Sequence, residues 1–216
     1  MALLTLRRDQ IADVRTRVDL TVRRSAGVQR FPGVLLLRTP ASLRFEALSP
    51  FGPPFMLATV SEGTVVIYNV ADNRVLTGPA TASAARRWLG IALAAEDLVG
   101  ILLGRVGPPP DLREAAIVPA NGDGPSLLLT AGRQRRRLWL DLETAVISKL
   151  EIGEAPDRLV VVYEWPTRGD LPERIHVAAS GLEAEVRYDE PAISVGVDPG
   201  RFSLSLPETA EIQRFY

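Results

Sequence analysis

The stretch that decides the fold is LRFEALSPFGPPFMLATVSEGTVVIYNVADNRVLTGP, residues 43–79. Its short β-favouring runs are separated by turn-forming residues, namely Pro50-Phe51-Gly52-Pro53-Pro54, Glu62-Gly63 and Asp72-Asn73. This spacing predicts four short strands joined as an antiparallel meander. Phe51 stands at the tip of the first turn, where side chains usually face solvent and are polar. The position of this aromatic residue therefore needs an explanation of its own.

The residues before the meander predict two longer strands. Apolar and polar residues alternate from residue 14 to residue 23, which is typical of a half-buried strand whose inner residues are Val14, Thr16, Val18, Leu20 and Val22. A second strand, Val28–Arg38, contains Phe31-Pro32-Gly33, where proline removes a hydrogen-bond donor and glycine permits a bulge. Because residues 34–37 are all apolar, we expect this strand to be central or covered on both faces.

Helical patterns interrupt the strands. Residues 80–90 are rich in alanine, and residues 94–104 place Leu98, Ile101 and Leu102 at helical spacing, which predicts two short helices. Residues 2–11 predict a third, amphipathic helix. Strand patterns then resume at about residues 115–119, 126–131, 135–142, 146–152, 158–165, 174–179, 183–188 and 202–206. So many consecutive antiparallel strands predict a sheet that curls or closes, since a wide flat sheet is unusual.

The composition is that of an ordinary globular protein of 216 residues, which we expect to form one domain. With 46% hydrophobic and 24% charged residues the chain can bury a sizeable core, and its net charge of −1 predicts no strong attraction to nucleic acid. Cysteine is absent, which excludes disulfides and thiolate chemistry. The N-terminal apolar run is too short for a secretory signal, and no stretch approaches the ~20 apolar residues of a membrane span. The sequence as written therefore predicts a soluble protein.

Sequence patterns for catalysis, metal binding or phosphate binding are absent, so no catalytic residue, metal or cofactor is expected. His176 is the one histidine and lies in a strand pattern without an evident partner, so we interpret it as structural. Glu96 and Asp97 stand at a helix start, where negative charge suits the helix dipole. The basic run Arg133, Arg135, Arg136 and Arg137 is interpreted as a solvated turn rather than a headgroup site.

The shape of the predicted sheet bears on function. A curved sheet with an aliphatic concave face, closed by two short helices, would enclose a cavity suited to an acyl chain. The same side chains would equally well fill a dry core, and periodicity does not decide between these outcomes.

Several segments resemble the LolB-like proteins of the LolA/LolB superfamily, which sort outer-membrane lipoproteins. They are Leu48-Ser49-Pro50-Phe51-Gly52, ARRWLG (85–90), AAEDLVGILLGRVGPPPD (94–111), Trp139-Leu140-Asp141, Val161-Val162-Tyr163, Leu171-Pro172-Glu173-Arg174-Ile175 and residues 202–207. The resemblance spans residues 11–210. It implies an α+β fold that is mainly antiparallel β, an unclosed half-barrel of about eleven strands capped by helices.

The resemblance also implies a function without catalysis. A LolB-like protein is a periplasmic lipid or lipoprotein carrier, or an outer-membrane lipoprotein receptor, that holds acyl chains in a hydrophobic cavity. It receives lipoproteins from a donor carrier protein, contacts the membrane surface, and is often anchored through a lipidated N-terminal cysteine that this sequence lacks. The side chains expected to line the cavity here are Val18, Phe45, Leu57, Ile67, Trp88, Leu98 and Leu102.

Phe51 matches the exposed hydrophobic residue by which LolB-like proteins deliver lipid to the membrane. Burying one phenylalanine contributes ~1.5–3 kcal/mol, enough for transient membrane contact. Alternatively, the ring folds back onto Phe55 or Met56. Two other functions also remain open for the whole chain: a non-transporting periplasmic module that senses a lipid or protein ligand, and an enzyme acting on envelope lipids, for which the sequence offers no nucleophile.

Overall fold

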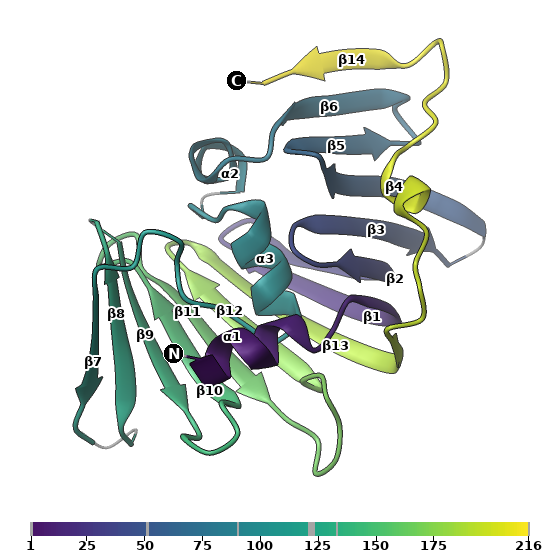
Figure 1. The fold of residues 1–216 in the computed structure, drawn as a ribbon. Helices are drawn as coiled ribbons and strands as arrows, with labels where there is room; N and C mark the ends of the chain where they lie inside the picture. Colours follow the sequence, from purple (N-terminus) through teal and green to yellow (C-terminus); the bar gives the residue numbers. More distant parts are fainter. Residues whose placement is uncertain (1, 51, 90, 121–123, 133, 216) are drawn as a thin grey trace.

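The protein is built on one large curved sheet whose concave side holds two short helices (Figure 1). The computed structural model describes residues 2–50, 52–89, 91–120, 124–132 and 134–215, without the side chains of residues 88 and 89. The described strands form a 14-stranded sheet in the order β14-β6-β5-β4-β3-β2-β1-β13-β12-β11-β10-β9-β8-β7. Since β14 and β7 stand at opposite ends of this order, the barrel is unclosed.

The helices are α1 (Ala2–Asp9), α2 (Ala82–Leu89) and α3 (Ala95–Leu102), and a 3₁₀ turn, η1, covers Pro199–Phe202. The strands are β1 (Asp13–Arg24), β2 (Gly27–Arg38), β3 (Ser42–Ser49), β4 (Gly52–Ser61), β5 (Thr64–Asn69), β6 (Arg74–Pro79), β7 (Glu114–Val118), β8 (Ser126–Ala131), β9 (Gln134–Leu140), β10 (Ile147–Ile152), β11 (Leu159–Glu164), β12 (Arg174–Ala179), β13 (Leu182–Ile193) and β14 (Glu211–Arg214).

The unclosed antiparallel architecture and the meander β3–β6 are confirmed. The strand number is wrong, since the described sheet has 14 strands rather than about eleven. The strand predicted at 202–206 is also wrong, because Phe202 ends η1 and the next strand is β14, which pairs with β6 in parallel. The sequence did not predict β14, because this strand has only four residues and its side chains do not alternate between apolar and polar.

Strand β1 joins the two halves of the sheet, because it pairs with β2 on one side and β13 on the other. Oppositely charged residues face each other across β1 and β13: Arg17 and Asp189, Asp19 and Arg187, and Arg23 and Glu183. Opposite charges at directly paired positions stabilise a ladder and disfavour a slipped register. These pairs therefore help to fix how the early strands meet the late ones.

The two faces of the sheet have different partners. The inner, concave face carries Phe45, Leu138 and Ile175, which are buried in one core with Val99 and Ile101 of α3. The chain after β13 crosses the outer face. There Arg44 of β3 donates hydrogen bonds to the main-chain carbonyls of residues 201 and 203, at 2.8 and 3.2 Å.

The predicted bulge at Phe31-Pro32-Gly33 is wrong, since β2 keeps one unbroken register with β1. Gly33 instead allows β2 and β3 to approach closely. A β-carbon on Gly33 would lie 2.6 Å from the Phe45 ring and would also meet the Glu46 carbonyl oxygen. Glycine is therefore required here by packing.

Substituting Gly33→Ala is expected to lower the free energy of unfolding by ~1–3 kcal/mol, because the added methyl displaces the Phe45 ring. Denaturant unfolding measures the change. The matched control is Gly100→Ala in α3, where the nearest atom is 3.4 Å from the new β-carbon. The control should leave stability unchanged or raise it by ~0.5–1 kcal/mol, because glycine disfavours helices. Equal effects of the two substitutions would contradict the proposed contact.

Candidate functional site

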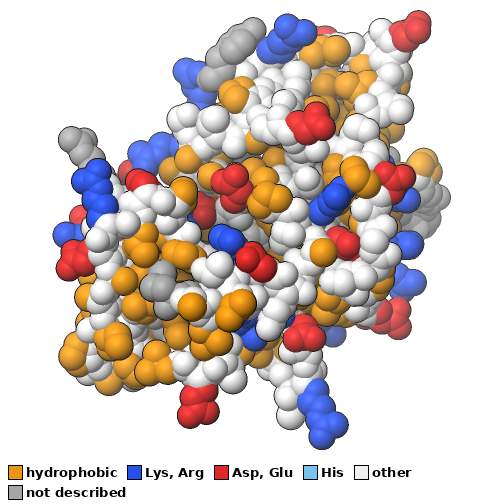
Figure 2. Space-filling model, viewed as in Figure 1, with side chains coloured by type: hydrophobic (Ala, Val, Ile, Leu, Met, Phe, Trp, Pro, Cys, Tyr) orange, Lys and Arg blue, Asp and Glu red, His pale blue; other side chains and the backbone are white. Residues whose placement is uncertain are grey.

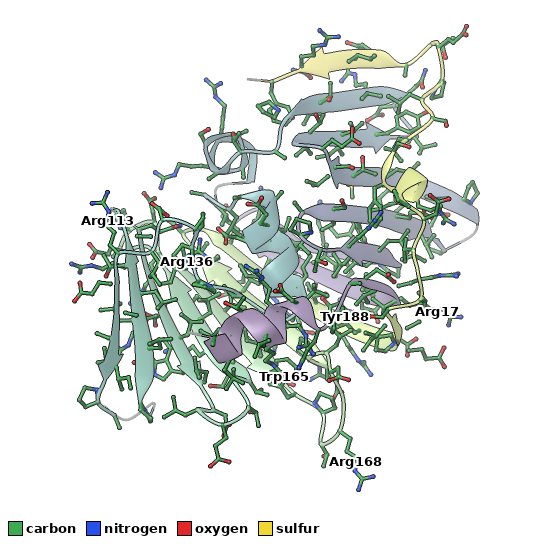
Figure 3. The ribbon with its side chains drawn as sticks, in the orientation of Figure 1. Arg17, Arg113, Arg136, Trp165, Arg168 and Tyr188 are labelled. Carbon is green, nitrogen blue, oxygen red and sulfur yellow. The ribbon has the colours of Figure 1, made fainter. Side chains whose placement is uncertain are left out.

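The middle of the inner face is filled by α3 and the chain that follows it. Val99 and Ile101 of α3, and Leu103 and Val106 beyond it, are buried in the core. The Tyr188 hydroxyl of β13 donates a 2.6 Å hydrogen bond to the Leu102 carbonyl, and burial raises its pKa above the usual range (Figure 3). The hydroxyl therefore stays protonated and ties α3 to the sheet.

Four of the residues predicted to line a cavity belong to this filled region. Leu98 and Leu102 lie on α3, where they are partly buried against the core. Val18 and Phe45 lie on the sheet beneath and are only 4% and 8% exposed. The protein's own side chains cover these two, so they act here as core residues.

An apolar stripe farther along the same face is only partly buried. We name Met56, Ala58, Val65, Ile67 and Leu76 the β4–β6 stripe. Ala58 pairs with Phe45, and Ile67 pairs with Ala58 and Leu76. Directly paired residues of antiparallel strands point to the same face. Ile67 therefore lies on the inner face.

The prediction that Leu57 lines the inner face is wrong. Leu57 pairs with Glu46 and Tyr68, so it lies on the face opposite to Phe45. Residues 55–58 are apolar without alternation, and the β3–β4 register shifts at Leu48, so the sequence did not identify which side chains point inward.

Two further predicted contacts lie outside the described part of the chain. The side chain of Trp88 is not among those the structure describes, and Phe51 lies outside the described residues.

The opposite end of the sheet has a second apolar stripe, which the sequence analysis missed. We name Ile117, Leu127 and Leu140 the β7–β9 stripe. Ile117 pairs with Leu127, which pairs with the buried Leu138, so the stripe continues the inner face. Ile117 is 68% exposed, and Figure 2 shows hydrophobic side chains gathered at the lower left, over these strands and beside α1. The apolar run at residues 127–129 was the available signal, but it did not reveal which end of the sheet stays uncovered.

Between the stripes lies a charged pocket of about 440 Å³. Its lining includes Arg8, Glu96, Asp97, Arg105, Arg136 and the prolines 108–110. Asp97 and Arg136 form an ion pair of 2.8 Å, and their side chains are only 17% and 6% exposed. The interpretation of the basic run as solvated is therefore wrong for Arg136. It agrees with the side chain of Arg135, which is 60% exposed. Arg133 lies outside the described residues.

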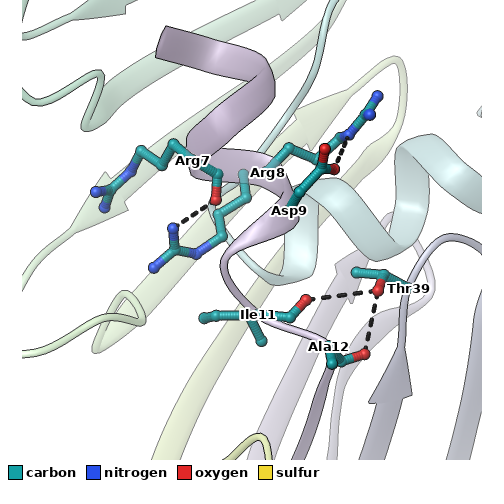
Figure 4. A network of polar contacts seen from close by, with 7 residues as sticks. Arg7, Arg8, Asp9, Ile11, Ala12 and Thr39 are labelled. Atoms are coloured by element: carbon teal, nitrogen blue, oxygen red, sulfur yellow. Dashed lines mark hydrogen bonds and ion pairs between the residues drawn. The ribbon is translucent and has the colours of Figure 1, made fainter.

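Arg105 is a fully buried cation at the floor of this region. Its guanidinium donates to the carbonyls of Arg7 and Asp170 at 2.7 and 3.0 Å and to Gln10 at 2.9 Å. Desolvation, followed by the nearby Arg7, lowers its pKa to about 10, so it remains charged at neutral pH. Near Arg105, the Thr39 hydroxyl donates hydrogen bonds to the carbonyls of Ile11 and Ala12, where the chain leaves α1 (Figure 4).

The single histidine lies on the outer face, away from the stripes. His176 Nε2 is 2.8 Å from Glu164, and its Nδ1 is 3.5 Å from Glu185. Among the described residues no group of three or more His, Asp or Glu side chains is placed to bind a metal. Within the same residues, no helix combines the length and the apolar character needed to cross a membrane.

Replacing Asp97 with asparagine is expected to destabilise the protein by ~3–5 kcal/mol, because Arg136 is left as a buried charge without its carboxylate. Denaturant unfolding measures the loss. The double variant Asp97→Leu/Arg136→Met removes both charges and should recover most of it. The matched control is Glu154→Gln, whose partner Arg135 is exposed and which should change stability by less than ~1 kcal/mol. A small effect of Asp97→Asn would contradict the structural role of the pair.

Known structures share this architecture, although neither a family model nor a curated protein matches the chain by sequence. One is a domain from Vibrio parahaemolyticus assigned to outer-membrane lipoprotein sorting, with a TM-score of 0.63 and 12% identity over 93% of this chain and 94% of that one. A DUF1329 family protein from Desulfovibrio piger has a TM-score of 0.64 and 12% identity, over 94% of this chain and 95% of that one. A LolA superfamily protein from Nitrosomonas europaea has a TM-score of 0.62 and 11% identity, over 94% of this chain and 96% of that one. The chain therefore has the LolA/LolB-like fold.

Proposed function

We propose that this protein binds the acyl chains of lipids or lipoproteins on the inner face of its sheet. The observation that carries the proposal is the β4–β6 stripe, where aliphatic side chains on the concave face are only partly buried. The LolA/LolB-like fold supports it, because the similar structures include one assigned to outer-membrane lipoprotein sorting and one from the LolA superfamily.

The energetics favour an acyl ligand. Each buried methylene contributes ~0.8 kcal/mol, so about ten contribute ~8 kcal/mol before the costs of association are subtracted. A stripe that covers one side of a chain supplies only about half of this, so the proposal also requires contacts from α3 on the other side. In this proposal Ile67, Leu98 and Leu102 contact the ligand, Trp88 adds a further contact, and Val18 and Phe45 form the floor beneath α3.

The finer proposal is a non-enzymatic periplasmic carrier or outer-membrane lipoprotein receptor, acting as one domain over residues 1–216. It takes lipoproteins from a donor carrier protein and contacts the membrane surface through Phe51. A lipidated N-terminus outside this sequence would anchor it to the outer membrane.

The filled middle of the inner face favours a second candidate, a non-transporting envelope module that senses a lipid or protein ligand. α3 covers Val18 and Phe45, which leaves less room for cargo than an empty half-barrel would. Mass spectrometry of protein purified from a membrane-containing host separates lipid binding from protein sensing: a carrier or a lipid sensor retains acyl lipid, and a module that senses a protein does not.

Ile67→Asp is expected to weaken binding of a fluorescent fatty acid at least tenfold, because a carboxylate placed in the β4–β6 stripe must be desolvated by the acyl chain. Fluorescence titration measures the dissociation constant. The matched control is Val28→Asp, since Val28 is 57% exposed and pairs with the outward-facing Arg23. Equal affinities of both variants and the unmodified protein would reject the β4–β6 stripe as the binding surface.

Phe51→Glu is expected to reduce binding to liposomes severalfold, because it replaces the hydrophobic residue proposed to enter the membrane with a charge. Liposome co-sedimentation measures the effect, with the fatty-acid titration as the control that should remain unchanged. A variant that sediments with liposomes as well as the unmodified protein would remove Phe51 from the proposal.

A further inference from the structure

The C-terminal strand β14 differs from the other described strands. It is the only one of them that pairs in parallel, and all four of its residues are exposed. It continues the sheet beyond β6, at the upper end in Figure 1. A short exposed strand at a sheet edge occupies main-chain hydrogen-bonding groups that another strand can use.

The contacts that hold β14 are mostly at the surface. Arg74 pairs with Glu211 at 3.1 Å, but their side chains are 65% and 71% exposed, so solvent weakens the pair. Asn73 donates to the Thr209 carbonyl at 3.0 Å. Upstream, Phe202 is only 2% exposed and fixes the chain independently. η1 is therefore held by contacts other than those that hold β14, which is paired to β6 by main-chain hydrogen bonds.

One buried side chain anchors the segment that follows β14. Phe215 is 7% exposed, and a β-carbon on Gly78 would lie 2.5 Å from its ring and 2.5 Å from its main-chain carbonyl oxygen. Gly78 pairs with Val65, a member of the β4–β6 stripe, so the ring covers the inner face. Gly78 therefore creates a specific seat for an aromatic residue.

We propose that the β6 edge is a binding site for an extended segment of a partner protein, and that β14 occupies it as a tethered substitute. The contacts that residues 211–215 make with β6 indicate what the partner segment must contain. It should run parallel to β6, with an acidic residue beside Arg74 and an aromatic residue four positions later over Gly78. Addition of a strand to a sheet edge is a common mode of peptide recognition, in which main-chain bonds give affinity and side-chain seats give specificity.

The proposal does not require that an acyl chain binds, because it uses the main chain of β6 and the Gly78 seat, although this seat borders the β4–β6 stripe at Val65. It also implies that β14 competes with a partner segment for the β6 edge. A tethered segment acts at an effective concentration in the mM range, so the tail excludes weak peptides and a partner must bind better than the tail does.

The test uses the full chain and a fluorescein-labelled peptide, TAEIQRF, which is the sequence of residues 209–215. Fluorescence anisotropy compares the unmodified protein with Phe215→Ala, whose tail loses its anchor. We expect the peptide to bind Phe215→Ala at least about tenfold more tightly than the unmodified protein. Adding Gly78→Val, which fills the aromatic seat, should abolish this binding, as should replacing the phenylalanine of the peptide with alanine.

Circular dichroism and thermal unfolding of each variant verify that the sheet is intact. Failure of the peptide to bind folded Phe215→Ala would overturn the proposal, as would equal binding of a scrambled peptide. A dimer formed by exchange of tails, detected by size-exclusion chromatography, would assign the β6 edge to a second copy of this chain and would also overturn it.

Discussion

A buried guanidinium holds the inner layer of this protein together. Arg105 lies just beyond α3, and its hydrogen bonds reach the carbonyl of Arg7 in α1, Gln10 after that helix, and the carbonyl of Asp170 between β11 and β12. Removing a charge from water is costly unless most of its donors are bonded, and here the two terminal nitrogens of Arg105 are bonded, so these segments are held in place around it. The position of α1 and α3 over the sheet, and with it the division of the inner face into covered and open regions, depends on this interaction.

The size of the sheet explains why regions of the inner face remain open. Fourteen strands spaced ~4.8 Å apart span roughly 60 Å along the curve. Each helix has eight residues and is therefore only about 12 Å long. Of these, α1 and α3 cover the middle of the sheet and leave its two ends, where the β4–β6 and β7–β9 stripes lie. Open apolar surface is thus a consequence of the architecture and not of one unusual residue.

The sequence predicts the features that depend on neighbouring residues. The turns between residues 43 and 79 define the meander, and the alternation after Val14 defines β1, because both signals are local. The failures involve residues distant in sequence. Leu57 was placed on the wrong face because residues 55–58 do not alternate, and one position reverses the direction of a side chain. The Asp97–Arg136 pair joins residues 39 positions apart, and the pairing of β14 with β6 spans a still longer separation.

The two proposed binding surfaces share a boundary at Gly78. The Phe215 ring covers the inner face at this position, beside Val65 of the β4–β6 stripe, and so forms the end of that stripe. A partner segment with a larger or smaller side chain at this seat would change the length of apolar surface available to an acyl chain. Because coupling between two binding equilibria is reciprocal, an acyl chain that reaches Gly78 would alter the affinity of the β6 edge by the same factor. Such coupling would require no movement of α3, since the two proposed ligands would meet at Gly78 itself.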